Sequence, residues 1–183
     1  MKKLHFLIAL VLALALLLPL AIPAAAAPPQ VLGYVSGATY GGPEKQPALG
    51  VSGKVTQLAD GSLVGNWGIH FFKGSGIEYL ADTQWKCDEF EPLNLSQYGM
   101  GILPFNPSPN QAAFMGVFDC VSNSQNYKGQ YPWPIGFIIT DVAEPGAFAD
   151  SIAIFYGDGA GNWTNVDMIP GIEHGNFQVY MGE

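Results

Sequence analysis

Three carboxylates around a predicted tight turn are the residues of this sequence best suited to holding a cation. Asp141 and Asp150 flank a loop that also contains Glu144. Pro145 presets φ for the first central position of a turn, and Gly146 allows the positive φ of the second, so the chain should reverse sharply here. Two interpretations stay open. The three carboxylates gather around Ca²⁺, which prefers oxygen ligands, or Asp141 and Asp150 brace the loop by accepting hydrogen bonds from its unpaired amides.

A second acidic loop, at residues 158–167, places further oxygen donors between glycines. Its carboxylates lack the regular spacing and the closing glutamate of an EF-hand loop. The spacing therefore favours a plain hairpin turn over a second calcium loop.

Three aromatic residues in turn-rich segments are the candidates for ligand binding: Tyr131, Trp133 and Trp163. Flat rings with a polar edge stack against sugars and pack on peptide surfaces. If these rings are exposed side by side, the expected partner is a glycan or a surface protein. In the alternative interpretation, the loop tryptophans fold back as lids on the core.

No residue is predicted to be catalytic. Five carboxylates could include the acid and base of a small hydrolase, but such a run is usually a solvated face; they are Glu78, Asp82, Asp88, Glu89 and Glu91. His70 and His174 lack the His-Glu-x-x-His spacing of a zinc site, and the sequence has no Gly-x-Ser-x-Gly motif or dinucleotide fingerprint. No cofactor is required, and Ca²⁺ is the one cofactor left open.

The beginning of the chain predicts an export signal. Lys2 and Lys3 precede an apolar run over residues 6–22, and alanines follow at 24–27, which is the order of a signal peptide. The apolar run is short for a membrane-spanning helix. The expected location is therefore outside the cytoplasm, secreted or associated with the cell envelope, with no membrane insertion of the mature chain.

Cleavage after Ala26 divides the chain into a signal peptide, residues 1–26, and a single secreted β-domain, residues 27–183. The first part of that domain, residues 27–48, is expected to be a loose lead-in. Cys87 and Cys120 are the two cysteines of the chain. In an oxidising compartment an isolated pair is more often a disulfide than a metal site, so we expect one bridge between them.

The charge of the chain excludes nucleic acid as a partner. The formal net charge is −8, and all seven basic residues are lysines. A chain this acidic, without arginine, has no electrostatic attraction to DNA, RNA or an anionic membrane. The apolar fraction of 49% is too high for a disordered polymer and predicts a globule with a real core.

The elements that must position these side chains are strands. Residues 51–58 and 63–72 alternate on either side of an Asp-Gly turn and predict a hairpin, and further strand patterns cover 113–121, 135–140, 151–156 and 175–180. Prolines between 103 and 110 favour an extended surface loop. The fold class is all-β, an antiparallel sandwich or a partly open barrel of about seven to nine short strands.

The segment 136–154, with its Asp141-x-x-Glu-Pro-Gly turn and its Asp150-x-Ile strand, resembles a small extracellular β-domain of bacterial surface and secreted proteins, the post-COAP-1-like domain. Residues 175–179 are similar to its closing Gly-Asn-Ile-Gln-Ile strand, and 65–71 with 76–79 to its early hairpin. Val142-Ala143 stands where that family usually has Asn-Gly. The family has no established activity, so the resemblance implies a fold more than a function.

These observations predict a secreted, non-catalytic β-domain with a structural or binding role at or outside the cell surface. A calcium-stabilised carbohydrate-binding module is the first alternative, and a small carboxylate-dependent hydrolase is the second.

Overall fold

The structure is a computed structural model that describes residues 28–41, 49–73, 80–122, 132–142, 150–169 and 174–182. Within these ranges the elements are, in chain order, β1 (Val31–Gly41), β2 (Leu49–Leu58), β3 (Leu63–Phe71), β4 (Thr83–Glu91), the 3-10 helix η2 (Ser96–Tyr98), β5 (Gln111–Cys120), β6 (Trp133–Thr140), β7 (Ser151–Gly157), β8 (Trp163–Ile169) and β9 (His174–Met181). None of the helices in the described ranges has the length and apolar character needed to cross a membrane.

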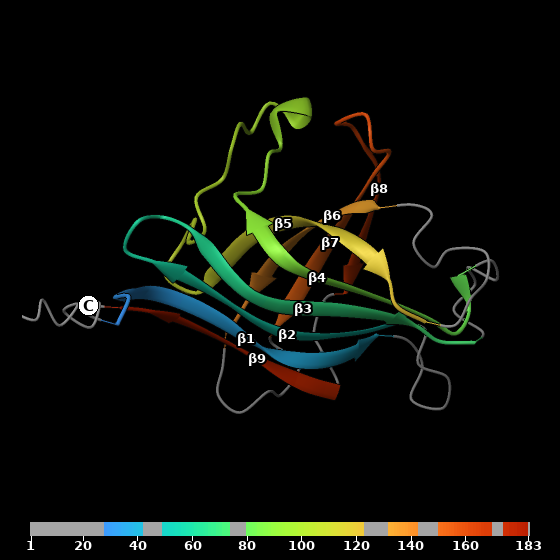
Figure 1. Cartoon of the computed structure of the whole chain (residues 1–183), viewed down its shortest axis with the longest axis horizontal. Coiled ribbons are helices and arrows are strands. Elements are labelled where there is room, and N and C mark those ends of the chain that lie inside the picture. Colours follow the sequence, from blue (N-terminus) through green and yellow to red (C-terminus); the bar gives the residue numbers. More distant parts are fainter. Residues whose placement is uncertain are drawn as a thin grey trace, which may run out of the picture.

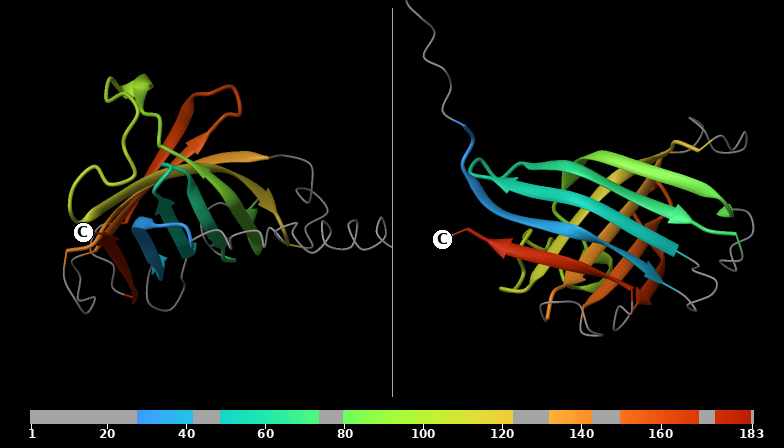
Figure 2. Two further views of the ribbon diagram at one scale, coloured as in Figure 1. Left: turned by 60° about the vertical axis from the view of Figure 1, so that its left-hand side comes forward. Right: turned by 90° about the horizontal axis from the view of Figure 1, so that it is seen from below.

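The nine strands form one antiparallel sheet in the order β8-β7-β6-β5-β4-β3-β2-β1-β9. From β1 to β8 each strand pairs with the next one along the chain, and β9 returns to pair with β1. The sheet curls into a half-barrel, which is plain in Figures 1 and 2. The prediction of an antiparallel all-β domain is confirmed, and of its two forms the partly open barrel is the one adopted.

The hairpin of β2 and β3 forms where the sequence predicts it. The Asp60 carboxylate accepts hydrogen bonds from the Ser62 amide at 2.9 Å and from the Ser62 hydroxyl at 2.6 Å, and Gly61 takes a φ of 86°. These bonds from Ser62 hold the pKa of Asp60 below its ordinary value, since they favour the charged carboxylate.

Strand β1 is the main departure from the sequence-based expectation. Residues 31–41 belong to the segment expected as a loose lead-in, yet they form a strand that pairs with β2 on one side and β9 on the other. Its inward positions include Val35 and Thr39, which are buried, with Gly37 between them. A glycine at a core position weakens the alternation of apolar residues that reveals a strand.

The inner face of the curl is filled by aromatic rings. In the register Gly37 lies opposite Phe177, Gly53 lies opposite Gly37, and Trp67 lies opposite Gly53. A Cβ on Gly37 would lie 2.6 Å from the Phe177 ring, and one on Gly53 would lie 2.8 Å from the Trp67 ring. The missing side chains let these two rings lie over the glycines and stack on each other, with centroids 5.9 Å apart and planes at 23°.

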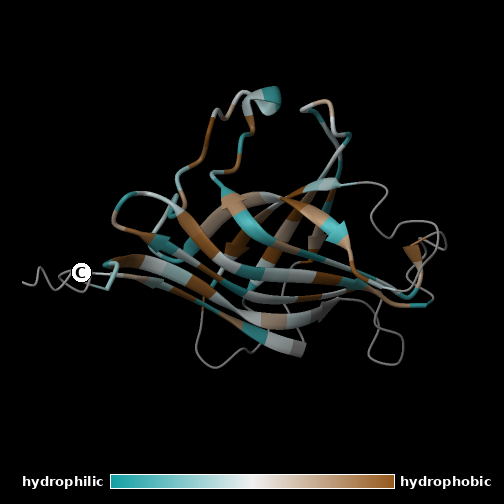
Figure 3. Ribbon diagram, in the orientation of Figure 1, coloured by the Kyte–Doolittle hydropathy of each residue, from teal (hydrophilic) through white to brown (hydrophobic). Residues whose placement is uncertain are grey.

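A second, smaller core lies on the outer face of the sheet. The β4–β5 connection contributes Leu93 and Leu95, and they pack with Ala113, Phe155 and Trp163. In Figure 1 this connection, with η2 at its tip, stands above the sheet and faces the rising β7–β8 hairpin. Figure 3 shows hydrophobic stretches along the connection, on the part that descends to the sheet.

Candidate functional site

A cleft of about 280 Å³ lies between the β4–β5 connection and the β7–β8 turn. Met115 of β5, Pro134 of β6 and the Trp163 side chain lie at its base. Pro92 and Ile102 line it from the β4–β5 connection. The glycines of the β7–β8 turn line the opposite wall. We call this depression the loop cleft.

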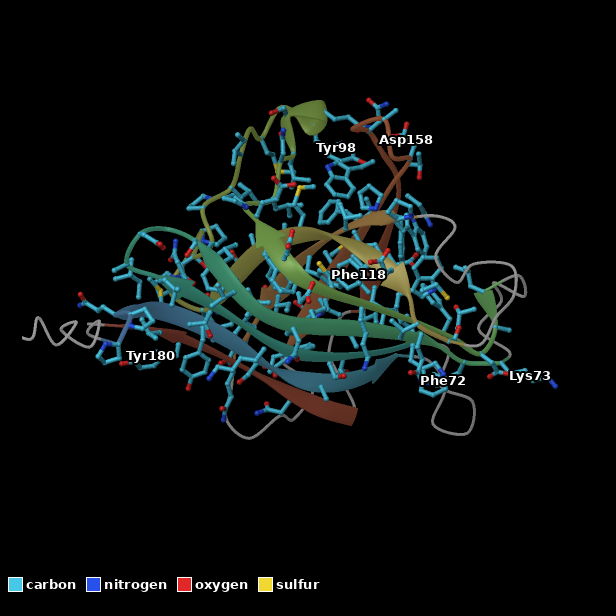
Figure 4. All side chains as sticks on the ribbon, in the orientation of Figure 1. Phe72, Lys73, Tyr98, Phe118, Asp158 and Tyr180 are labelled. Atoms are coloured by element: carbon cyan, nitrogen blue, oxygen red, sulfur yellow. The ribbon has the colours of Figure 1, made fainter. Side chains whose placement is uncertain are left out.

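Trp163 ties the two walls of the loop cleft together. Its backbone N–H donates to Gln97 Oε1 at 2.6 Å, and Gln97 Nε2 donates to the Trp163 carbonyl at 2.9 Å. The indole Nε1 of Trp163 donates to the Asn94 carbonyl at 2.6 Å. The Tyr98 ring lies 6.4 Å from the Phe155 ring across the same gap, and Figure 4 shows Tyr98 on one arm and Asp158 on the other.

The β7–β8 turn is held by Asp158. Its carboxylate accepts hydrogen bonds from the Ala160 amide at 2.8 Å, the Asn162 amide at 3.0 Å and Asn162 Nδ2 at 2.9 Å. These bonds, those from Asn162 above all, hold the pKa of Asp158 below its ordinary value. The loop predicted over residues 158–167 does contain a plain hairpin turn, but the turn covers only residues 158–162, and residues 163–167 belong to strand β8.

An acidic depression of about 550 Å³ adjoins the loop cleft, and Glu91 lines both. We call it the acidic trough; its carboxylates are Asp88, Glu89 and Glu91 of β4 and Asp119 of β5. The register of β4 against β5 shifts between Lys86 and Phe90. Because Cys87 and Phe90 both pack in the inner core, the extra residue turns Asp88 and Glu89 outward together.

A third hollow, of about 310 Å³, lies on the outer face of β2, β3 and β4 over Gly50 and Gly68. His70 and Lys86 line it. The His70 ring lies 4.1 Å from the Phe72 ring, so His70 is a strand residue packed on its own strand's end, as the sequence predicts.

The three predicted binding aromatics do not form one platform among the described residues. Trp133 is half-buried, donates Nε1 to the Gly157 carbonyl at 3.1 Å and stacks on Tyr156 at 5.1 Å. Trp163 is 7% exposed and packs in the outer core. These two tryptophans lie on opposite faces of the sheet, as lids on separate cores. Tyr131 lies outside the described residues.

An aromatic stack that no sequence motif indicates lies on the outer face of β1 and β9. Tyr34 and Tyr180 are cross-strand partners with ring centroids 5.2 Å apart and planes at 25°. Lys54 Nζ lies 4.5 Å from the Tyr34 centroid. Such pairs stabilise the pairing of neighbouring strands, and here they stabilise the attachment of β9, which is an edge strand.

The carboxylates of Asp141 and Asp150 accept backbone hydrogen bonds. Asp150 Oδ1 accepts from the Val142 amide at 3.1 Å and Asp150 Oδ2 from the Phe177 amide at 3.0 Å. Asp141 Oδ2 accepts from the Val179 amide at 2.9 Å. Only the Val142 amide belongs to the loop that Asp141 and Asp150 flank, and the rest of that loop lies outside the described residues. The other two amides belong to the outer edge of β9, so the two carboxylates join this strand to the ends of β6 and β7. Glu144 lies outside the described residues.

The predicted disulfide between Cys87 and Cys120 is wrong for this structure, in which both are buried free thiols. The register explains the difference. Cys120 lies opposite Trp85, whereas Cys87 Sγ points at Gly116, where a Cβ would lie 2.5 Å away. Cys87 Sγ donates to the Glu89 carbonyl at 2.9 Å, and Cys120 Sγ lies 3.3 Å from Ser122 Oγ. Burial raises the pKa of the Cys87 thiol to about 11.

No group of three or more histidine, cysteine, aspartate or glutamate side chains in the described ranges is arranged to hold a metal ion. Comparison with known proteins adds no family to this picture. No protein-family model, no curated protein and no solved structure gave a significant match. The site must therefore be interpreted from its own chemistry.

No motif in the sequence marks the residues that build the loop cleft, Gln97 and Ile102 among them. Asn94 and Gln97 are ordinary polar residues of a loop, and no local pattern marks a glutamine that pairs with a backbone 66 positions away. The prolines between 103 and 110 did mark the segment correctly as a surface loop, because they exclude a central strand.

Proposed function

We propose that this chain is an exported, non-catalytic binding domain and that the loop cleft is its ligand site. The observation that carries the proposal is the bond pair between Gln97 and Trp163, which joins the two walls of an apolar cleft within the protein itself. A preformed site loses less conformational entropy when it binds. Concave, mostly apolar sites with a few polar groups are the usual form of small-ligand sites.

The exported location belongs to the same proposal. It rests on the signal-peptide pattern of residues 1–26 and on the resemblance of the 136–154 segment to the extracellular post-COAP-1-like domain. The free thiols of Cys87 and Cys120 are compatible with an oxidising compartment, because both side chains are buried and a buried structural cysteine is inert.

The calcium-stabilised carbohydrate-binding module has less support than this proposal. Both oxygens of the Asp150 carboxylate already accept amide hydrogen bonds, so a cation beside them would face N–H dipoles of the wrong sign. Of the carboxylates considered for a hydrolase, Asp88, Glu89 and Glu91 line the acidic trough, and Asp82 does not. Glu78 lies outside the described residues, and nothing beyond the grouping of the other three supports the hydrolase alternative.

The proposal is tested with small neutral probes, indole and 1-hexanol, added to the ¹⁵N-labelled protein. We expect the amide signals of the cleft walls, above all residues 92–103 and 157–163, to shift in a saturable way. The variant Ile102→Ser should weaken the binding, because this side chain is 66% exposed and lines the cleft.

The matched control is Met168→Ser. Met168 is 72% exposed on β8 and does not line the cleft, so this change removes a similar exposed apolar side chain elsewhere. Shifts scattered over the surface, or equal effects of the two variants, would contradict the proposal. Turnover of a hydrolase substrate that is lost on Glu91→Gln would contradict its non-catalytic part.

A further inference from the structure

We infer that the loop cleft and the acidic trough together bind a cationic, amphipathic peptide segment, with one bulky apolar side chain in the cleft and lysine or arginine side chains over the trough. This inference rests on the proposed function and names the class of ligand.

The two depressions form one continuous surface along β4 and β5. Glu91 lines both depressions and is paired with Met115 at the base of the cleft. Met115, Val117 and Asp119 are alternate residues of β5. Met115 lines the loop cleft, and Val117 and Asp119 line the acidic trough. Since a strand rises about 3.4 Å per residue, Met115 and Asp119 are about 14 Å apart. An extended segment of about four residues spans that distance.

The charge of this surface selects a cation. The four trough carboxylates are joined to no other described residue by an ion pair or a side-chain hydrogen bond. Lys86 lies opposite Asp119 in the register, at the end of the trough remote from the cleft. Like charges held this close repel one another, so a positively charged ligand relieves repulsion that the free protein bears, and the net charge of −8 speeds its approach.

The apolar part of the surface excludes a purely ionic ligand. Pro92, Ile102 and Met115 present hydrophobic atoms that a simple cation or polyamine would leave in water. A bulky side chain seated there removes that area from solvent, which is favourable by about 25 cal/mol per Å². The same acidity disfavours an anionic lipid surface or a nucleic acid as occupant. The occupant that fits is a peptide that carries both a bulky apolar side chain and positive charges and is long enough to reach both depressions.

The test uses a fluorescein-labelled peptide with one tryptophan among lysines and glycines, titrated by fluorescence anisotropy. Two companion peptides replace the tryptophan by alanine or the lysines by glutamate. We expect saturable binding of the first peptide and at least tenfold weaker binding of each companion. Raising the salt concentration should weaken the binding, because the ion pairs are exposed.

The decisive variant is the pair Asp88→Asn with Glu91→Gln. Exposed ion pairs contribute little individually, so the expected loss of affinity is about three- to tenfold. Asp82→Asn is the matched control, because Asp82 is exposed and lines neither depression; it should leave the affinity unchanged. Ile102→Ser should weaken binding and Met168→Ser should not.

The outcomes separate the two proposals. If indole and 1-hexanol bind in the cleft but the lysine and glutamate peptides bind equally, the peptide inference is wrong and the proposed function stands. If the lysine peptide binds without regard to its tryptophan or to Ile102, the attraction is only electrostatic and the inference is overturned. If neither the neutral probes nor the peptide bind, both proposals are wrong.

Discussion

Gln97 and Trp163 exchange two hydrogen bonds across 66 positions of sequence, the glutamine side chain pairing with the tryptophan backbone as a neighbouring strand would. This pairing joins the β4–β5 connection to the start of β8. Long surface loops are usually the mobile parts of a domain, and here one of them is fixed to the strand beside it. The shape of the loop cleft depends on that attachment.

The substitution Gln97→Ala should loosen this attachment. It leaves the Trp163 amide and carbonyl without their partners in a partly buried place, and such a loss costs about 1–3 kcal/mol. We expect the free energy of unfolding in urea to fall by that amount, and the Trp163 amide to exchange faster with solvent by at least tenfold.

The control for Gln97→Ala is Ser96→Ala, in the same 3-10 helix. Ser96 is exposed, so its loss should change stability by no more than about 0.5 kcal/mol. An unchanged exchange rate at Trp163 in Gln97→Ala would show that the cleft walls are held by the outer core alone.

The hairpins of this fold could be predicted from the sequence because their information is local. The β2–β3 turn is specified by Asp60 and Gly61, and β6 and β7 by their own alternating apolar residues. The turn predicted at Pro145 and Gly146 lies outside the described residues. Strand β1 could not be found in this way, since its core position at Gly37 has no side chain of its own. The ring that fills this position belongs to Phe177, which is far along the chain.

The site was harder to predict than the fold for the same reason. Asp141 and Asp150 were identified because a carboxylate at a turn has a limited set of roles, yet their partners on β9 depend on the curl of the whole sheet. Trp163 was correctly noticed, but Leu93 and Leu95, with which it packs on the outer face, lie far away in the sequence. The Cys87 to Cys120 bridge failed because cysteine counting ignores register, and the register places Trp85 opposite Cys120.

Asp150→Asn should release the edge strand β9. Asparagine keeps one acceptor oxygen and turns an NH₂ group toward the Val142 or Phe177 amide, so a buried donor faces a donor. Asp150 is 1% exposed, and we expect the free energy of unfolding to fall by about 2–3 kcal/mol. The measurement is urea unfolding together with the exchange of the Phe177 amide. Asp82→Asn removes the same charge from an exposed site and should leave both quantities near those of the parent protein.

Added calcium should not stabilise the protein. A cation bound only to the folded state at a hundred times its dissociation constant would add about 2.7 kcal/mol. Both carboxylate oxygens of Asp150 and the Oδ2 of Asp141 already accept hydrogen bonds from backbone amides. We expect the same melting temperature with millimolar Ca²⁺ and with a chelator. If the melting temperature rises when calcium is added, and Glu144→Gln abolishes that rise, the calcium interpretation would be restored.

Gly53→Ala should be far more harmful than an ordinary glycine substitution. The added Cβ would clash with the Asn66 carbonyl oxygen and would lie 2.7 Å from Trp67 Cα and 2.8 Å from its ring, so the backbone of β3 and the Trp67 ring would both have to move. We expect the free energy of unfolding to fall by about 2–4 kcal/mol, as for other overpacked cores. Gly61→Ala is the control, because Gly61 also has a positive φ but open space around it, and the strain there costs about 1 kcal/mol. Equal losses in the two variants would mean that φ, not the contact with Trp67, requires the glycine.

The thiol of Cys87 makes the stability of the protein fall in alkaline solution. Its folded pKa is raised to about 11, whereas in the unfolded chain it ionises near its ordinary value, so between pH 9 and 11 the unfolded state binds fewer protons and gains stability relative to the folded one.

The check on this prediction is the free energy of unfolding measured from pH 8 to pH 11, which should decline less in Cys87→Ala than in the parent protein. In parallel, a thiol reagent should react slowly with the native protein, because neither cysteine side chain is accessible in the fold. In denaturant the same reagent should label both Cys87 and Cys120. A purified protein that yields no thiols in denaturant until it is reduced would carry the bridge after all, and the register of β4 against β5 would then have to differ from the one described here.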